Sequence, residues 1–278
     1  MKKLLLFIAL ITIVLSAEIY PQYTPKQLLM MGTASFNGGD YETALKYFNE
    51  YLQINVDDQF AITLRGNTYT KMKNFPSAMN DYSKAIQLDP NYDQAFLNRG
   101  VLHTAMGQFD LAANDFTQAI NIDQTNVSAY LGRGYAYLQN NNLSSALNDF
   151  GKAIHYQPYN PDPWRERALV HLSMGDAVSA MKDIDYAVAL DPQNPAGYEK
   201  RGIILLQLKE YEPALKDFNT AIEIRPEKAE FYYYRGIVHE QLRNPEAAIK
   251  DYKKVLELNP DFGSKVQSQL DFLLNKPR

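Results

Sequence analysis

The sequence has no cysteine among its 278 residues. This absence excludes disulfide bonds, metal sites held by thiolates, a cysteine nucleophile and a lipid anchor on a cysteine. Basic side chains are in the minority, because 28 lysine and arginine residues stand against 32 aspartate and glutamate residues. A net negative surface without a basic cluster repels a phosphate backbone, so we expect no nucleic-acid partner.

Long apolar runs are absent except at the start of the chain. Two lysines precede the apolar run from Leu4 to Leu15, and two small residues follow it. This order is typical of a signal peptide, and the run is shorter than the ~20 residues with which a helix crosses a bilayer. We therefore expect residues 1–17 to be cleaved, residues 18–24 to form a short linker, and the mature chain to be periplasmic or secreted and away from the membrane. Leu15 is bulkier than the residue usual beside a cleavage site, so an uncleaved N-terminal membrane anchor is the alternative.

What the sequence does contain is a self-similarity with a period of 34 residues. One alanine recurs at seven equivalent positions, and a glycine precedes it by twelve residues at six of them. The alanines are Ala44, Ala78, Ala112, Ala146, Ala180, Ala214 and Ala248, and the glycines are Gly32, Gly66, Gly100, Gly134, Gly202 and Gly236, with Ala168 at the remaining position. A fixed period of this length indicates an array of helical repeats, each of which buries its apolar face against its neighbours.

Seven repeats follow one another without a gap. They span residues 25–58, 59–92, 93–126, 127–160, 161–194, 195–228 and 229–262. Each contains two segments with apolar residues at helical spacing, and the second segments begin at good N-cap residues, namely Asp40, Asn74, Asn142, Asp176 and Asn244. Residues 263–278 follow as a capping helix and tail, with Val266, Leu270, Leu273 and Leu274 on one side of the helix. The sequence thus predicts an all-α solenoid of helix-turn-helix repeats.

The glycines lie inside the expected first helices, where glycine costs ~0.5–1 kcal/mol relative to alanine. A compensating contact is therefore expected, most simply a close approach of the second helix. The recurring alanine, such as Ala112, is the expected partner. Large residues of the second helices would then fill the space between repeats, and these are Phe48, Tyr82, Phe116, Phe150, Ile184, Phe218 and Tyr252.

An arginine and an aspartate sixteen residues apart recur in six of the repeats. The arginines are Arg65, Arg99, Arg133, Arg167, Arg201 and Arg235, and the aspartates are Asp81, Asp115, Asp149, Asp183, Asp217 and Asp251. The first repeat has neither. Their co-occurrence predicts a ladder of ion pairs, within a repeat or between neighbours. If the pairs are exposed, each contributes only ~0–1 kcal/mol.

Residues for catalysis or metal binding are not brought together by this pattern. His103, His171 and His239 share one repeat position, but alternate repeats are separated by several helix diameters of ~8–10 Å, whereas ligands lie ~2 Å from a metal. No phosphate-binding glycine loop, nucleophile elbow or zinc-protease motif occurs in the sequence. We expect no metal, no cofactor and no enzyme activity.

The repeats resemble the tetratricopeptide repeat, whose pattern is W-x2-L-G-x2-Y, then A-x3-F, then P. The fourth residues of the repeats are large and apolar, namely Leu28, Ile62, Phe96, Tyr130, Trp164, Tyr198 and Tyr232. The main departure is the arginine that stands at the family's usual leucine. The resemblance implies a right-handed superhelical solenoid whose concave groove holds another polypeptide without catalysis. A membrane-tethered assembly factor of a cell-envelope complex is the alternative function, and an enzyme is a weaker one.

The resemblance also implies which side chains face the groove, namely those at repeat positions five, nine and twelve. In repeats four to six these are mostly apolar, so they form either an exposed strip for a partner segment or a half-buried contact between neighbouring first helices. Asn67 and Asn98 match the asparagines of the family's carboxylate clamp, but Thr63, Ser128 and Gly132 replace its cations, so no clamp is expected. The predicted protein-binding residues are Asn67, Asn98, Leu131, Tyr135, Leu138, Arg165, Leu169, Leu172, Glu199, Ile203, Leu206 and Tyr233, with Gln139 and Gln207 beside them. The sequence does not indicate the partner or the oligomeric state.

Overall fold

The computed structural model describes residues 23–275. The predicted signal peptide and all but the last two residues of the predicted linker lie outside this range. Every regular element in the described part of the chain is a helix, which confirms the all-α fold class. None of the helices between residues 23 and 275 combines the length and the apolar character that a bilayer span requires.

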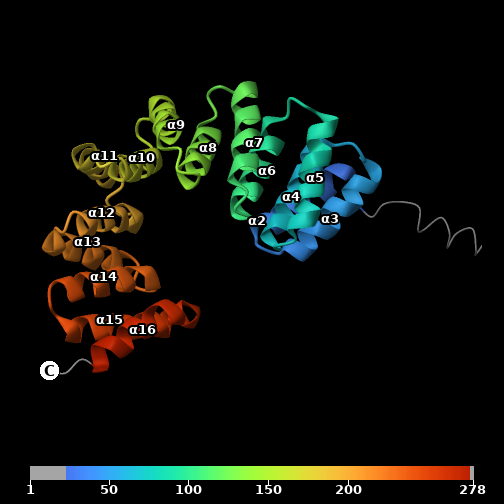
Figure 1. Ribbon diagram of the computed structural model, residues 1–278. Helices are drawn as coiled ribbons and strands as arrows, with labels where there is room; N and C mark the ends of the chain where they lie inside the picture. The colour runs from blue at the N-terminus through green and yellow to red at the C-terminus, as the bar shows by residue number, and fades with distance from the viewer. Residues whose placement is uncertain (1–22, 276–278) are drawn as a thin grey trace, which may run out of the picture. The chain divides into compact units, whose positions relative to one another are not determined.

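The chain divides into two compact units, and Figure 1 shows the helices of each. The described residues of unit one are 23–124, and those of unit two are 125–275. Unit one contains the helix pairs α2 (Pro25–Asn37) with α3 (Tyr41–Ile54), α4 (Gln59–Lys71) with α5 (Phe75–Leu88), and α6 (Asp93–Ala105) with α7 (Phe109–Ile122). Unit two contains α8 (Val127–Gln139) with α9 (Leu143–Tyr156), α10 (Pro161–Ser173) with α11 (Ala177–Leu190), α12 (Pro195–Gln207) with α13 (Tyr211–Ile224), and α14 (Ala229–Gln241) with α15 (Pro245–Leu258), followed by the short helix η1 (Pro260–Phe262) and α16 (Gly263–Asn275).

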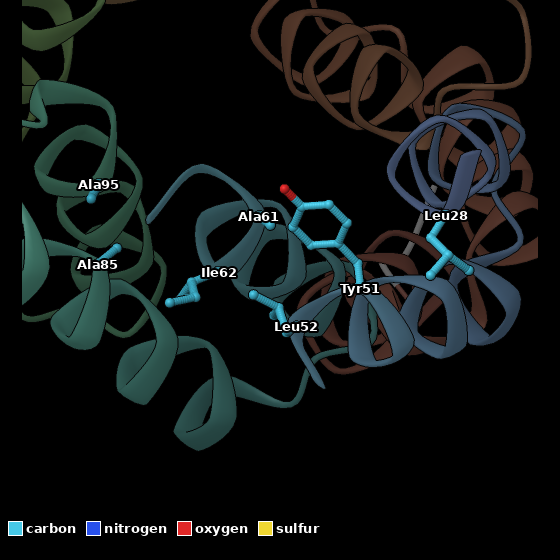
Figure 2. Close-up of a cluster of buried hydrophobic side chains, with 7 residues drawn as sticks. All are labelled: Leu28, Tyr51, Leu52, Ala61, Ile62, Ala85 and Ala95. Atoms are coloured by element: carbon cyan, nitrogen blue, oxygen red, sulfur yellow. The ribbon is translucent and has the colours of Figure 1, made fainter. Parts of the chain in front are cut away.

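Within each unit the second helix of a repeat also packs against the first helix of the next repeat. Figure 2 shows this continuity in unit one, where Leu28 of α2, Tyr51 of α3, Ile62 of α4 and Ala95 of α6 belong to one buried cluster. A repeat therefore completes its apolar core only with its neighbours, as the predicted solenoid requires.

The predicted N-cap residues begin the second helices. The side chain of Asp40 accepts a hydrogen bond from the backbone N–H of Thr43, and Asn74 does the same for Ser77. Asn142, Asp176 and Asn244 cap α9, α11 and α15 in the same way. Each cap satisfies one of the backbone donors that a helix start leaves unpaired.

The helical glycines face aromatic rings rather than the recurring alanines. A Cβ added to Gly100 would lie 2.9 Å from Cε1 of Phe116, and the other five glycines meet the equivalent ring of their own repeat at 2.6–2.8 Å. The expectation that Ala112 is the partner was therefore wrong. Ala112 and Phe116 are four residues apart on one helical face, and it is the longer side chain that reaches the glycine. The fifth repeat follows the same rule, because Ala168 stands there together with the smaller Ile184, and both are fully buried.

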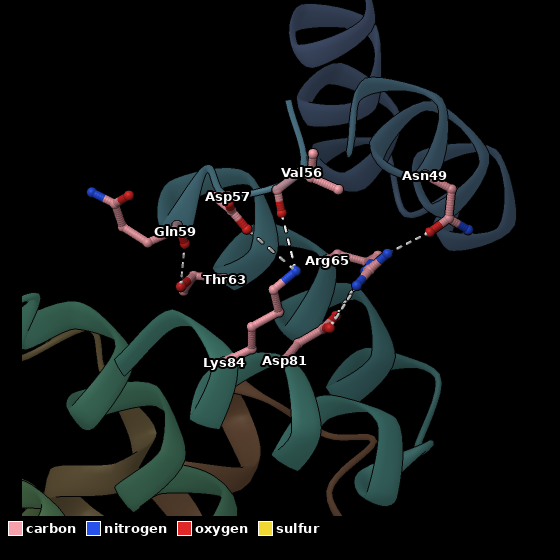
Figure 3. Close-up of polar contacts among 8 residues, drawn as sticks. All are labelled: Asn49, Val56, Asp57, Gln59, Thr63, Arg65, Asp81 and Lys84. Carbon is pink, nitrogen blue, oxygen red and sulfur yellow. Dashed lines mark hydrogen bonds and ion pairs between the residues drawn. The ribbon is translucent and has the colours of Figure 1, made fainter. Parts of the chain in front are cut away.

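The ion-pair ladder is confirmed, and it lies within each repeat. In all six repeats the arginine donates Nε and Nη2 to the two carboxylate oxygens of the aspartate, at 2.6–2.8 Å. Figure 3 shows this geometry for Arg65 and Asp81, and it also shows Arg65 Nη1 donating to Asn49 of the preceding repeat at 2.9 Å. A planar guanidinium suits such paired contacts because its donors form a fixed fork. A ladder arginine with such a third bond therefore fixes two repeats in register.

The ladder aspartates are buried, whereas the sequence analysis allowed for exposed pairs of small energetic effect. Asp81 is 2% exposed, and no ladder aspartate is more than 5% exposed. Breaking an ion pair costs more stability when the carboxylate is buried than when it is exposed, because the buried charge has been removed from water. Five of the arginines also lie over the aromatic ring three residues before them, as Arg167 lies 4.9 Å from the ring centre of Trp164.

The three histidines at the shared repeat position face the ladder aspartates of their own repeats. Nε2 of His103, His171 and His239 lies 3.7, 3.7 and 3.9 Å from the nearest carboxylate oxygen. All three are partly buried. Across residues 23–275 no cluster of histidine, aspartate and glutamate has the arrangement of a metal site.

His239 should make the stability of the fold depend on pH. Burial lowers the pKa of His239 below its ordinary value of 6.5. The charge of Asp251 opposes this shift of the pKa, and the charge of Arg235 adds to it. The Nδ1 atom of His239 is buried without a hydrogen bond. Because the unfolded chain binds this proton more readily, the contribution of His239 is complete above pH 6.5 and is lost as the pH falls below that value. Urea unfolding at about pH 7.5 and about pH 5.5, on either side of that pKa, should show a larger loss for the native chain than for His239→Tyr. An equal loss in both proteins would contradict this role.

Helix α16 lies at the position of the first helix of an eighth repeat. Val266 and Leu270 are buried against a cluster that includes Tyr252 and Val255, and Leu273 is half-buried there. Leu274 is 55% exposed, so it does not share their side as the sequence analysis expected. Leu270 stands where the repeats have glycine, and it fills space that an incoming aromatic ring would need. Helix α16 therefore covers the apolar side of the seventh repeat.

Candidate polypeptide-binding surface

A hollow of about 250 Å³ lies in unit one and is formed mostly by first helices. Its lining residues are Phe36 of α2, Asn67, Thr70 and Lys71 of α4, Tyr82 of α5, and Asn98 and Val101 of α6. We call this surface the amide hollow. It combines apolar walls with a few polar groups, which is the usual composition of a ligand site.

The polar groups of the amide hollow form one hydrogen-bonded network. Asn67 Oδ1 accepts two hydrogen bonds of 2.8 Å, one from the hydroxyl of Tyr82 and one from Nδ2 of Asn98. Thr70 Oγ1 lies 3.0 Å from the Tyr82 hydroxyl, and Gln94 Nε2 donates to Asn98 Oδ1 at 2.8 Å. Since Oδ1 of Asn67 faces these donors, its own Nδ2 group is left without a partner among the described residues. The network therefore fixes both amides and leaves N–H donors for a ligand.

The hydroxyl of Tyr82 anchors this network from the core. Tyr82 is 2% exposed, and burial raises its pKa to about 12. The hydroxyl consequently keeps its proton at neutral pH and donates it to Asn67. Val101 at the wall of the hollow is 52% exposed, so an incoming apolar group has a surface to contact.

The predicted binding residues of unit two lie mainly in contacts between helices. Leu131 and Leu138 pack against the cluster of Phe150 and Val170. Leu169 and Leu172 pack in the same way around Ile184, and Ile203 and Leu206 pack around Phe218. All six are half-buried, and Tyr135 is the more exposed member of the set at 39%. These six side chains therefore form half-buried contacts between helices rather than a fully exposed strip.

Three polar or aromatic residues of that set, Arg165, Glu199 and Tyr233, already have partners. Arg165 pairs with Asp162, and Glu199 accepts a 3.1 Å hydrogen bond from Lys228. Tyr233 contacts the rings of Tyr234, Tyr252 and Phe262. Of the predicted binding residues, the structure thus brings Asn67 and Asn98 together in one hollow, and it places the others in unit two.

Sequence reasoning missed several residues of the amide hollow. Phe36 stands at repeat position twelve and Val101 at position nine, which are groove positions, so the same rule applied to repeats one and three would have identified them. Tyr82 was assigned to the core alone, and only the structure shows its hydroxyl reaching the first helices.

Comparisons with known proteins agree with this architecture. Family models described as "Tetratricopeptide repeat" match residues 28–55, 131–195 and 229–262, and a model described as "TPR repeat" matches residues 66–107, 102–141 and 204–242. A comparison with curated proteins gives no match.

Solved structures with the same fold include a tetratricopeptide repeat protein from Parabacteroides merdae. It is 18% identical, has a TM-score of 0.76, and the match covers 90% of this chain and 99% of that one. Cut9 with Hcn1 from an APC/C hetero-tetramer gives 19% identity and a TM-score of 0.73 over 93% of this chain and 51% of that one. PilF of Pseudomonas aeruginosa gives 18% identity and a TM-score of 0.62 over 77% of this chain and 96% of that one. At these identities the matches demonstrate the fold alone.

Proposed function

The chain belongs to the tetratricopeptide repeat family and has the fold of a protein-interaction scaffold, and we propose that it binds an extended polypeptide segment. The segment binds to the first-helix face of unit one, at the amide hollow. The observation that carries the proposal is the pair of asparagines from neighbouring repeats, Asn67 and Asn98, whose amides are joined by a 2.8 Å hydrogen bond with N–H donors left over. The hollow offers amides, hydroxyls and one lysine as groups that can bind a polypeptide.

An extended backbone fits these donors. Its carbonyl oxygens repeat along the segment and accept hydrogen bonds from amide N–H groups, whatever its side chains are. Phe36 and Val101 on the walls would contact apolar side chains of the segment, and the exposed Lys71 would favour a nearby acidic one.

Replacing Asn98 with alanine should weaken binding by about two- to tenfold, since a hydrogen bond contributes ~0.5–1.5 kcal/mol. The binding partner for this test is a peptide selected from a phage-displayed library of random dodecamers, and its affinity is measured by calorimetry. Asn98 is the better target because its loss leaves the Tyr82–Asn67 bond in place.

The matched control is Asn80→Ala, which removes an exposed asparagine on the second helix α5. It should leave the affinity unchanged. A folded Asn98→Ala protein that binds the selected peptide as tightly as the native chain would contradict the proposal.

We propose further that the protein acts after export, in a periplasm or outside the cell, on the basis of the signal-peptide pattern in residues 1–17. The alternative of a membrane-tethered assembly factor rests on Leu15 at the expected cleavage region. Sequencing the mature N-terminus distinguishes them, because a start near Glu18 supports export of a free chain, whereas an intact Met1 supports the tether.

A further inference from the structure

The ladder arginines have a third donor, Nη1, and they differ in whether Nη1 finds an acceptor in the preceding repeat. Its acceptor is the side chain sixteen residues earlier, and the bonds are Arg65 to Asn49 at 2.9 Å, Arg99 to Ser83 at 3.2 Å, Arg201 to Asp185 at 2.9 Å and Arg235 to Asn219 at 2.8 Å. The position that corresponds for Arg167 is Gly151, which has no side chain. Arg167 donates Nε and Nη2 to Asp183, and within residues 23–275 its Nη1 has no acceptor.

Gly151 lies in the wall of a surface groove of about 570 Å³ on helix α9. The groove is lined by Ser144, Leu147, Asn148, Gly151, Lys152 and His155. A Cβ added to Gly151 would have no neighbour within 4 Å, so the space beside it is open. Glycine inside a helix costs ~0.5–1 kcal/mol, and here no tight contact explains it.

A groove one repeat later shares two of these lining positions, and it also includes the arginine that corresponds to Arg167. Met181 and Asp185 line that groove at the positions of Leu147 and Gly151, and Arg201 lines it at the position of Arg167. It is smaller, about 230 Å³, and the side chain of Asp185 fills the space beside Arg201. By repeat equivalence Arg167 corresponds to Arg201 and Gly151 to Asp185, so the acceptor that Arg201 Nη1 contacts has no counterpart beside Arg167.

The charge of the groove selects the ligand. Its lining has no acidic side chain, Lys152 is exposed and forms no ion pair among the described residues, and His155 lies one turn further along α9. The exposed Ser144 and Asn148 add further hydrogen-bond donors. A carboxylate oxygen beside Gly151 would accept from Arg167 as Asp185 does from Arg201, and its charge would be met by Lys152.

We propose that this groove binds a glutamate or aspartate side chain of an acidic polypeptide segment. The bound carboxylate takes the place that a side chain of the protein itself occupies beside four other ladder arginines. The site lies on a second helix and is independent of the amide hollow, so the failure of either proposal leaves the other standing.

The test uses acetylated, amidated tetraglutamate as the probe, with calorimetry for affinity and amide NMR shifts of residues 144–155 for location. The native chain should bind it at α9. Gly151→Asn should weaken binding at least tenfold, because the new side chain supplies the acceptor from within, as Asn49 and Asn219 do. The same substitution should raise the urea midpoint of unfolding, which shows that the variant is folded.

A second test variant and three controls complete the experiment. Lys152→Gln should weaken binding by about threefold, as expected for an exposed ion pair, whereas Lys250→Gln, which removes an exposed lysine from α15, should not change it. Tetraglutamine should not bind, and inorganic phosphate should not displace tetraglutamate at equal concentration. No binding by the native chain, unchanged affinity in folded Gly151→Asn, or displacement by phosphate would overturn the proposal.

Discussion

Replacing Arg65 with methionine should lower the free energy of unfolding by about 3 kcal/mol, because it leaves Asp81 ionised and without its guanidinium partner inside the protein. Asp81 is 2% exposed, whereas the side chain of Arg65 is 22% exposed, which places the expected loss at the lower end of the range for broken buried pairs. Urea denaturation followed by circular dichroism measures the loss.

A double-mutant cycle separates the pair from its surroundings. Arg65→Met with Asp81→Leu should lose less than the sum of the single changes, since the double variant contains no unpaired buried charge. Arg225→Met is the matched control, because Arg225 forms an exposed pair with Glu227 at 3.8 Å and its loss should cost at most ~1 kcal/mol. Additive losses at Arg65 and Asp81 would show that the ladder has no energetic coupling.

Replacing Gly100 with leucine should destabilise unit one by about 3 kcal/mol, the upper end of what overpacking costs. Even the first added carbon would lie 2.9 Å from the ring of Phe116, which is fully packed at 1% exposure. Hydrogen exchange should show the loss of protection first in α6 and α7 and then in α4 and α5. Unchanged protection in these helices would contradict the packing model.

The residues of the fifth repeat suggest a second substitution that should restore the stability lost by a side chain at position 100. Gly100→Ala with Phe116→Ile reproduces the Ala168–Ile184 pair, so the double variant should recover most of the stability that Gly100→Ala alone loses. Failure of the added Phe116→Ile change to restore stability would mean that another neighbour, rather than the ring, excludes a side chain at position 100.

The repeat architecture could be predicted from the sequence because the same pattern of residues recurs in every repeat. The period of 34 residues and caps such as Asp40 placed the helix pairs, and the spacing of arginine and aspartate predicted the ladder. The burial of the aspartates could not be predicted, because charged residues are usually exposed and only the packing around Asp81 removes it from water. The partner of Gly100 depended on how far Phe116 reaches past Ala112, which spacing alone does not determine.

The candidate site was predictable only in part. Asn67 and Asn98 are 31 residues apart and meet because α4 and α6 are neighbouring first helices, which the repeat pattern implies. The half-burial of Leu138 and Leu172 depends on how closely adjacent repeats pack, and the sequence does not contain that distance. Gly151 is apparent in the sequence, but only the Nη1 contacts of four other ladder arginines show that an acceptor is missing at that position.

Site-specific photocrosslinking to the selected dodecamer peptide tests the binding proposal most directly. A benzoylphenylalanine crosslinker at Val101, on the wall of the amide hollow, should form a covalent adduct with the peptide, and one at Asn80 on α5 should not. The yield of the adduct should fall when Asn98→Ala is combined with the Val101 crosslinker, at a peptide concentration near the native dissociation constant. Crosslinking at position 80 and none at position 101 would contradict the account and place the bound segment on the second-helix face.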